Sequence, residues 1–198
     1  MKAEEELAQC RSDGGSVVTV GTFDGVHEGH QLLIQRVKEE ARRRGLLSTV
    51  VTFKQIPRTV INPDLRVPCL TPLPERVRLL ASLGVDQVAP LTFDADLSRL
   101  TAQEFVALLV RYLGMRHLVT GPGFALGRGR GGTSEVLAQI GQELGYTVQV
   151  LEPFLQDGAR VSSTAVRQAL AERRMERVAA CLGRPFALVG RVVDGHHR

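Results

Sequence analysis

The chain has 198 residues, of which 43% are hydrophobic and 23% are charged, and it carries a formal net charge of +4 at neutral pH. This length fits one main domain, and this composition excludes a disordered or low-complexity protein. Because the sequence has neither a run of about 18 apolar residues nor a basic and apolar leader, we expect a cytoplasmic protein without a membrane segment.

The excess of positive charge favours an anionic partner. Lys and Arg are spread along the chain rather than gathered in one basic helix, and aromatic residues, which stack on bases, make up 5% of the sequence. We therefore expect a nucleotide rather than a nucleic acid as the partner. The cysteines Cys10, Cys69 and Cys181 are widely spaced and follow no metal-ligand pattern, so we predict no metal site.

Short β-branched segments alternate with amphipathic ones along the chain. The first segment, 16–21, is followed by a turn and by a stretch in which Leu33, Ile34 and Val37 recur at helical spacing. Strand and helix alternate in this way as far as residue 151, and two further helices follow. The alternation predicts a Rossmann-like α/β fold, a mainly parallel sheet with helices on both faces. The predicted strands are 16–21, 47–53, 87–91, 117–120 and 147–151, and the predicted helices are 30–44, 74–83, 101–112, 134–144, 163–170 and 175–182.

Two segments interrupt this alternation. The stretch 54–72 contains Pro57, Pro63, Pro68 and Pro72, so we expect no regular helix there but a lid or substrate loop. The tail 184–193 has the pattern of a further strand.

The segment from Gly21 to His30 stands where the first strand ends and a helix begins, which is where open α/β sheets bind ligands. His27 and His30 flank Gly29 at helical spacing. Imidazole N–H groups and the free N–H groups of a helix start both suit phosphate oxygens, and glycine lets a ligand approach the backbone. The motif predicts an anion site, although one histidine that caps the helix and another in the core would also explain it.

A second motif, Val161-Ser162-Ser163-Thr164-Ala165-Val166-Arg167, precedes an apolar helical pattern. Its hydroxyls and N–H groups would face an anion, and Arg167, one turn later, adds a forked cation. Taken alone, the motif is also an ordinary capping sequence. The glycine-rich stretch 121–132 carries Arg128 and Arg130 and is predicted to be a loop whose cations reach phosphate or flavin, or a plain surface connection.

Both motifs resemble the two signatures of the bacterial FAD synthetases, which are bifunctional riboflavin kinase/FMN adenylyltransferases. The resemblance extends over about 180 residues, which is a usual size for one domain. It includes Gly84-Val85-Asp86 and Leu182-Gly183-Arg184-Pro185-Phe186. It implies an N-terminal nucleotidyltransferase domain in residues 1–183, with 184–198 as a linker or as the start of a truncated kinase domain.

The resemblance also implies an activity and a set of site residues. The activity is transfer of AMP from ATP, with Mg²⁺, to FMN, which gives FAD and pyrophosphate, with His27 and His30 as catalytic residues. The implied ATP-binding residues are Gly21, Thr22, Phe23, Asp24, Gly25, Gly29, Ser162, Ser163, Thr164 and Arg167. The implied flavin-binding residues are Phe53, Pro57, Gly123, Phe124, Arg128 and Arg130.

The chain departs from this family at the expected flavin side. Where the family has Thr-Phe-Asp-Pro-His-Pro, this chain has Thr52-Phe53-Lys54-Gln55-Ile56-Pro57, and Gly123 stands where the family has Asn or Asp. Lost hydrogen bonds weaken ring recognition but leave phosphate chemistry intact. Two alternatives therefore stay open: a different phosphorylated acceptor, and a nucleotide- or flavin-binding relic without turnover.

Overall fold

The computed structural model describes residues 1–11 and 14–190 and is built around a five-stranded sheet of order β3-β2-β1-β4-β5. Every neighbouring pair in this sheet is parallel, as predicted. The middle residues of β1 and β2 are buried, as expected for strands covered on both faces. The strands are β1 (Ser16–Gly21), β2 (Leu47–Phe53), β3 (Gln87–Leu91), β4 (Met115–Thr120) and β5 (Thr147–Val150).

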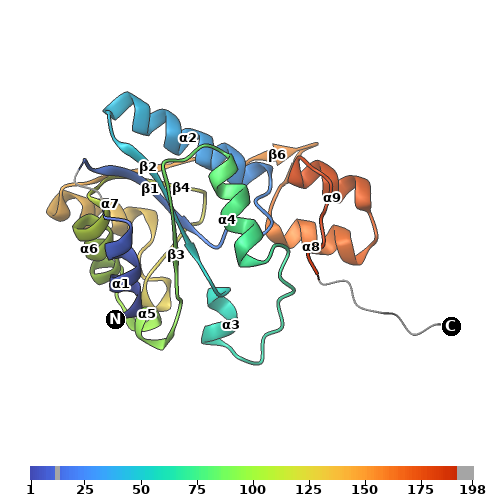
Figure 1. Ribbon diagram of the computed structural model, residues 1–198, viewed down its shortest axis with the longest axis horizontal. Coiled ribbons are helices and arrows are strands. Elements are labelled where there is room, and N and C mark those ends of the chain that lie inside the picture. Colours follow the sequence, from blue (N-terminus) through green and yellow to red (C-terminus); the bar gives the residue numbers. More distant parts are fainter. Residues whose placement is uncertain (12–13, 191–198) are drawn as a thin grey trace.

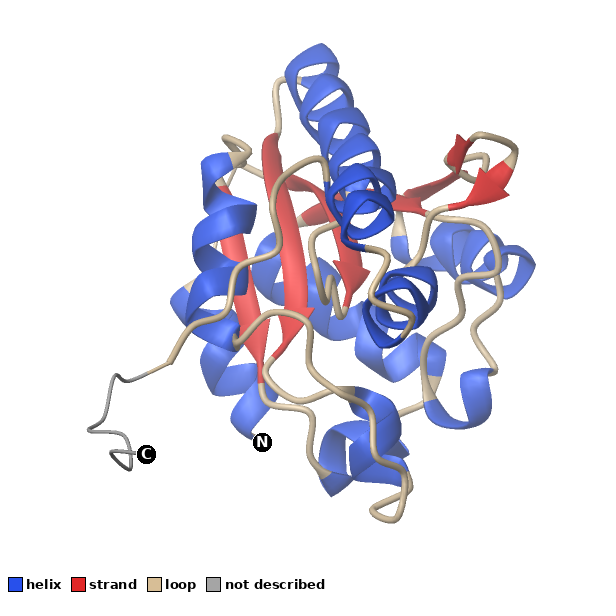
Figure 2. Ribbon diagram, turned by 90° about the vertical axis from the view of Figure 1, so that its right-hand side faces the viewer, coloured by secondary structure: helices blue, strands red, loops and turns tan. Residues whose placement is uncertain are grey.

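Helices cover both faces of the sheet (Figures 1 and 2). On one face α1 (Lys2–Gln9), α6 (Ala102–Leu113) and α7 (Ser134–Leu144) pack on the largest apolar cluster, which includes Val18, Leu109 and Leu118. On the other face, α2 (Glu28–Arg44) and α4 (Leu73–Ser82) bury Ile34 and Leu80. Because all strands run the same way, their carboxyl ends meet at one edge, where a ligand site is expected.

A small lobe adjoins this edge (Figure 1). It consists of α8 (Ser163–Ala171), α9 (Met175–Leu182) and the two-stranded hairpin β6 (Leu155–Gln156) and β7 (Ala159–Arg160). The lobe has its own apolar cluster of Val166, Val178 and Leu182, and Leu70 from the segment before α4 completes it. The lobe therefore has a core separate from that of the sheet.

The structure corrects several sequence-based expectations. Segment 54–72 does contain a short helix, α3 (Pro57–Ile61). Pro57 is tolerated there because it stands in the first turn, where a backbone N–H would make no hydrogen bond within the helix. The predicted strand at 184–193 is wrong for 184–190, which is irregular; 191–193 lies outside the described residues. The sequence analysis also missed α1, α5 (Ala95–Arg99), the hairpin and a 3₁₀ turn at Arg128–Arg130.

Within residues 1–11 and 14–190, none of the helices combines the length and the apolar character that crossing a membrane requires.

Candidate active site

The loop between β1 and α2, residues 22–27, has an unusual backbone. Phe23 and Val26 have φ angles of 52° and 41°, in the left-handed region that non-glycine residues rarely adopt. Both side chains are buried, at 2% exposure each. Such a conformation persists when the surrounding structure enforces it, and it is common at functional sites.

Every carbonyl of residues 22–26 accepts a hydrogen bond, mostly from a side chain that is distant in sequence. The Thr22 carbonyl accepts from Arg76 Nη1 at 2.7 Å and from Thr52 Oγ1 at 3.0 Å. Val26 N donates to the Phe23 carbonyl at 3.0 Å. The remaining donors are Ser163 Oγ to Asp24, Arg184 Nη2 to Gly25, and Arg184 Nη1 and Gln31 Nε2 to Val26.

The Asp24 carboxylate connects this loop to the small lobe. It is 2% exposed and accepts from the backbone N–H groups of Leu70 and Thr71, both at 3.0 Å. It also pairs with Arg167 of α8, whose Nε donates to the Pro68 carbonyl. Arg167 is therefore held by the protein itself in this structure.

His27 and His30 form a stacked pair at the start of α2, with ring centroids 3.5 Å apart and planes inclined by 19°. His27 is the N-cap, and its Nδ1 accepts from the backbone N–H of His30 at 3.3 Å. This bond places the ring proton of His27 on Nε2, which remains as a donor. A Cβ at Gly29 would lie 3.3 Å from His27 Nδ1, so glycine leaves room for this ring.

Both imidazoles are neutral at physiological pH. Burial lowers the pKa of His27 to about 4. Burial, followed by the nearby His27 and Arg76, holds the pKa of His30 well below its usual value. The buried Nδ1 of His30 has no hydrogen-bond partner among the described residues, although buried polar atoms are usually paired. The pair thus offers neutral N–H donors rather than fixed positive charges.

The start of α8 faces the histidine pair. Ser162 is the N-cap and accepts from Ala165 N at 3.1 Å, and Ser163 Oγ donates to the Asp24 carbonyl at 2.7 Å. Within the described part of the chain, the backbone N–H groups of Ser163 and Thr164 make no hydrogen bond. A helix start with free N–H groups attracts anions.

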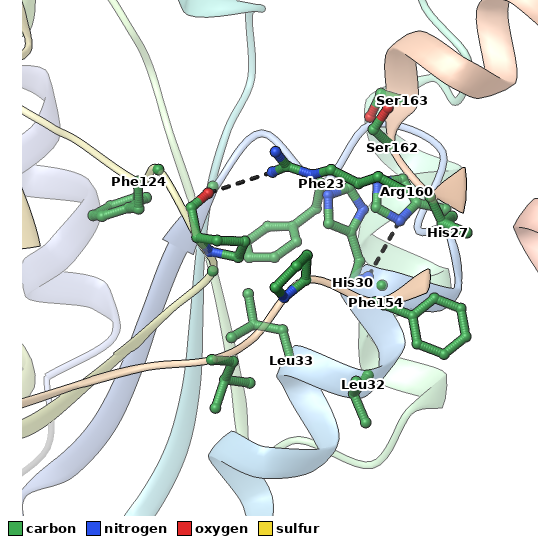
Figure 3. Close-up of a pocket in the computed structure, with 18 of the residues that line it drawn as sticks. Phe23, His27, His30, Leu32, Leu33, Phe124, Phe154, Arg160, Ser162 and Ser163 are labelled. Carbon is green, nitrogen blue, oxygen red and sulfur yellow. Dashed lines mark hydrogen bonds between the residues drawn. The ribbon is translucent and has the colours of Figure 1, made fainter. Parts of the chain in front are cut away.

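One cavity of about 500 Å³ joins the two predicted motifs, at the carboxyl edge of the sheet (Figure 3). His27 and His30 line it on one side and Ser162 and Ser163 on another (Figure 3). Of the predicted ATP-binding residues, the cavity is lined by Gly21, Thr22, Phe23, Gly29, Ser162, Ser163 and Thr164. Asp24, Gly25 and Arg167 lie outside it, in the contacts that join the loop to the lobe.

The predicted flavin-binding residues divide in the same way. Gly123, Phe124 and Arg130 line the cavity. Phe53 does not; its ring packs on Phe93, with centroids 5.3 Å apart, and on the core beyond. Pro57, at the start of α3, and Arg128, at the start of the 3₁₀ turn, also lie outside the lining.

The three divergent positions after β2, Lys54, Gln55 and Ile56, do not line the cavity, and Ile56 directly precedes α3. Lys54 Nζ forms an ion pair with Glu6 of α1 at 2.7 Å, and Gln55 Oε1 accepts from Phe93 N at 2.9 Å. Both side chains therefore contact other parts of the protein.

Sequence reasoning missed several lining residues, chief among them Arg160. Its Nη2 donates to the Pro122 carbonyl at 3.3 Å, a bond that joins the hairpin to the glycine-rich loop across the cavity (Figure 3). Arg160 immediately precedes the second motif, which was the one signal available for it. Phe154 and Glu152 also line the cavity, and no pattern in the sequence distinguishes them.

Comparison with known proteins identifies the family of this chain. The family model of FAD synthetase matches residues 9–165, a segment that contains the strained loop, the histidine pair and the start of α8. The chain belongs to the FAD synthetase family. Both motifs on which the sequence analysis based its resemblance fall within the match or at its border, and the recognition is confirmed.

The relatives of this chain within the FAD synthetase family are longer than the chain itself. The bifunctional riboflavin kinase/FMN adenylyltransferase of Escherichia coli (strain K12) is 43% identical over 190 residues, which cover 96% of this chain and 60% of that protein. The protein of the same name from Pseudomonas fluorescens is 41% identical over 182 residues, covering 91% and 58%. The chain thus spans about three-fifths of these relatives, within the usual range of one domain.

The fold of this member of the FAD synthetase family also matches a solved structure. A protein from Streptococcus pneumoniae, described as a macrolide-efflux protein, superimposes with a TM-score of 0.81 at 29% sequence identity. The match covers 94% of this chain and 61% of that one. The Rossmann-like α/β prediction is confirmed.

Proposed function

We propose that the chain transfers the AMP group of ATP to FMN, giving FAD and pyrophosphate. The observation that carries the proposal is the single cavity that the histidine pair and the start of α8 line together. Two groups of neutral and backbone N–H donors on opposite sides of one cavity suit a polyphosphate chain. The family and the names of its relatives support this choice of reaction.

In this reaction a phosphate oxygen of FMN attacks the α-phosphorus of ATP, and the bond from that phosphorus to the bridging oxygen breaks. Pyrophosphate leaves with the bonding electron pair. Because the attacking phosphate is already ionised, no general base is needed. We propose that His27 and His30 donate N–H groups to the oxygens on which charge develops, and that Thr164, with the N–H groups of Ser163 and Thr164, holds the leaving pyrophosphate.

Arg130, Gly123 and Phe124 are the predicted flavin residues that line the cavity, and we propose that Arg130 and Arg160 bind the FMN side of the reacting phosphates. We propose that Asp24, Gly25 and Arg167 act from outside the cavity, by holding the loop against α8. The cytoplasm, where ATP and FMN are available, is the proposed location.

The described residues offer no cluster of metal-ligating side chains for Mg²⁺. No group of three His, Cys, Asp or Glu side chains in the described ranges is arranged to hold a metal ion, and the Asp24 carboxylate is occupied by hydrogen bonds. Mg²⁺ would instead enter on the phosphate oxygens of ATP, which it prefers as ligands.

The first test measures FAD and pyrophosphate when the purified chain is given Mg-ATP and FMN. We expect both products in equal amounts. His27→Asn retains an acceptor for the helix cap, and we expect it to lower kcat by about 100-fold, the scale of one lost transition-state donor. Thr164→Val should mainly raise the KM for ATP. Tight ATP binding without any FAD, or a faster reaction with another phosphorylated acceptor, would refute the proposal.

A further inference from the structure

We propose that Arg76 is a positioning residue for the histidine pair, acting through the strained loop from outside the cavity. The inference rests on the proposed adenylyl transfer for its kinetic consequence, but its structural part stands independently. Arg76 belongs to α4, and neither the sequence motifs nor the lining of the cavity include it.

Arg76 is buried in an unusual way for a cation. It is 2% exposed, and no carboxylate of the described residues forms an ion pair with it within 4.0 Å. Its Nη1 and Nη2 donate to the carbonyls of Thr22 and Phe53, at 2.7 and 2.8 Å, while its buried Nε has no partner among the described residues. Burial lowers the pKa of Arg76, and the nearby Asp24 carboxylate only partly offsets this effect. Burying an arginine whose direct partners are carbonyls is costly, so a purely structural role would be served better by an apolar residue.

The carbonyls that Arg76 holds stand at the carboxyl ends of the two central strands. Thr22 directly follows β1, and Phe53 ends β2, so the guanidinium ties these two strand ends together. Thr52 Oγ1 is the second donor to the Thr22 carbonyl, at 3.0 Å. Both lone pairs of this carbonyl are thus used, which fixes the orientation of the peptide just before the left-handed Phe23.

Phe23 passes this orientation on to the histidines. Its ring meets the ring of His30 edge to face, with centroids 5.1 Å apart, and His30 stacks on His27 (Figure 3). A Cβ at Gly21 would lie 3.1 Å from the Phe23 ring, so glycine leaves the ring its place. If the Thr22 peptide turned, Phe23 would leave its left-handed conformation and His30 would lose the ring that supports it.

The guanidinium also acts on the charge of His30. Three influences lower the pKa of this imidazole: burial first, then the neighbouring His27, then Arg76. Arg76 therefore holds the ring in place and favours its neutral form at the same time.

The experiment compares Arg76→Met, Arg76→Lys and Thr52→Val with the wild type. The matched control is Arg78→Met, which removes an exposed arginine from the same helix. The readouts are kcat, the KM for ATP, the melting temperature, and the titration of the His30 ring followed by NMR. Lysine can still donate to both carbonyls, so Arg76→Lys tests rescue.

We expect Arg76→Met to lower kcat by about 10- to 100-fold, the effect of misplacing catalytic groups by about 1 Å, with less than about threefold change in the KM for ATP. The pKa of His30 should rise in this variant. Arg76→Lys should recover most of the loss, Thr52→Val should show the same pattern more weakly, and Arg78→Met should behave as the wild type.

A folded Arg76→Met variant with kcat within twofold of wild type and an unchanged His30 titration would overturn the inference. So would a loss that Arg76→Lys does not recover. If Arg76→Met does not fold, Thr52→Val decides, because it acts on the same carbonyl. If the wild type makes no FAD, the proposed function fails, whereas the His30 titration still tests the positioning role.

Discussion

The properties of single residues at this site follow from what surrounds them. His27 lines the cavity and caps α2 with the same ring, so the two interpretations that the sequence left open for the motif are compatible. Capping requires a lone pair on Nδ1, and protonation would destroy it. Burial lowers the pKa of His27 to about 4 and thereby protects both roles.

The lowered pKa of His27 predicts how stability depends on pH. The unfolded chain takes up a proton near the usual value of about 6.5, but the folded chain does not until about 4. The contribution of His27 to the free energy of unfolding should therefore be constant above about pH 6.5. It should fall by about 3 kcal/mol as the pH falls from there to about 4. In His27→Asn, which caps without titrating, urea unfolding should show a smaller fall. Equal pH dependence in both proteins would contradict the assignment.

At the scale of elements, the loop and α8 are joined by a buried ion pair. Asp24 and Arg167 are 143 positions apart, and their contact brings the first motif against the second. The sequence predicted that Arg167 contacts ATP directly. That contact stays a prediction, but the pairing of Arg167 with Asp24 also suits the indirect role proposed above, in which Arg167 keeps the start of α8 facing the histidines.

A double-mutant cycle separates these two roles. If Arg167 acts through Asp24, then Asp24→Asn and Arg167→Met should each weaken ATP binding by about 3- to 10-fold, and the double variant by no more than either alone. If Arg167 contacts phosphate, Arg167→Met should weaken binding as much in the Asp24→Asn background as in wild type. Isothermal titration calorimetry gives the affinities, and the exposed Arg99, paired with Asp96, supplies the control Arg99→Met.

At the scale of the whole molecule, the apolar cluster of the lobe is separate from the clusters on the two faces of the sheet, and the junction between lobe and strained loop is largely polar. The lobe of α8 and α9 packs around Val166 and Val178, and its links to the strained loop are hydrogen bonds from Ser163, Arg167 and Arg184. A unit with a small core of its own and polar attachments opens more easily than the main core.

Bound ATP should change this difference in local stability. Because the cavity is lined by both the sheet side and the lobe, a ligand that binds both must disfavour opening. We expect ATP to slow amide hydrogen exchange in α8 and α9 more than in β1 and α6. Equal slowing everywhere would indicate that the lobe does not open independently.

Much of this arrangement could be predicted from the sequence. Alternating periodicity predicted the parallel sheet, and His27, His30, Ser162 and Ser163 stand out because two polar motifs at helix starts, one of them directly after a strand, together suit an anion better than capping alone explains. Arg76 could not be found in this way, since an arginine inside a helical pattern normally faces water. The strand expected at 184–193 is wrong for 184–190, where Phe186 packs against the apolar cluster of the lobe instead.

The way the strained loop is held determines when the site can form during synthesis. The side chains that donate hydrogen bonds to its carbonyls are synthesised later than the loop itself. Arg76 comes first, then Ser163, and finally Arg184, which lies 158 positions beyond Val26. A ribosome-bound chain that has made only the sheet strands would possess both histidines but no support for their final geometry. The proposed nucleotide site can therefore form only after the sheet has been synthesised, and a nascent fragment should bind ATP poorly until Arg184 has left the exit tunnel.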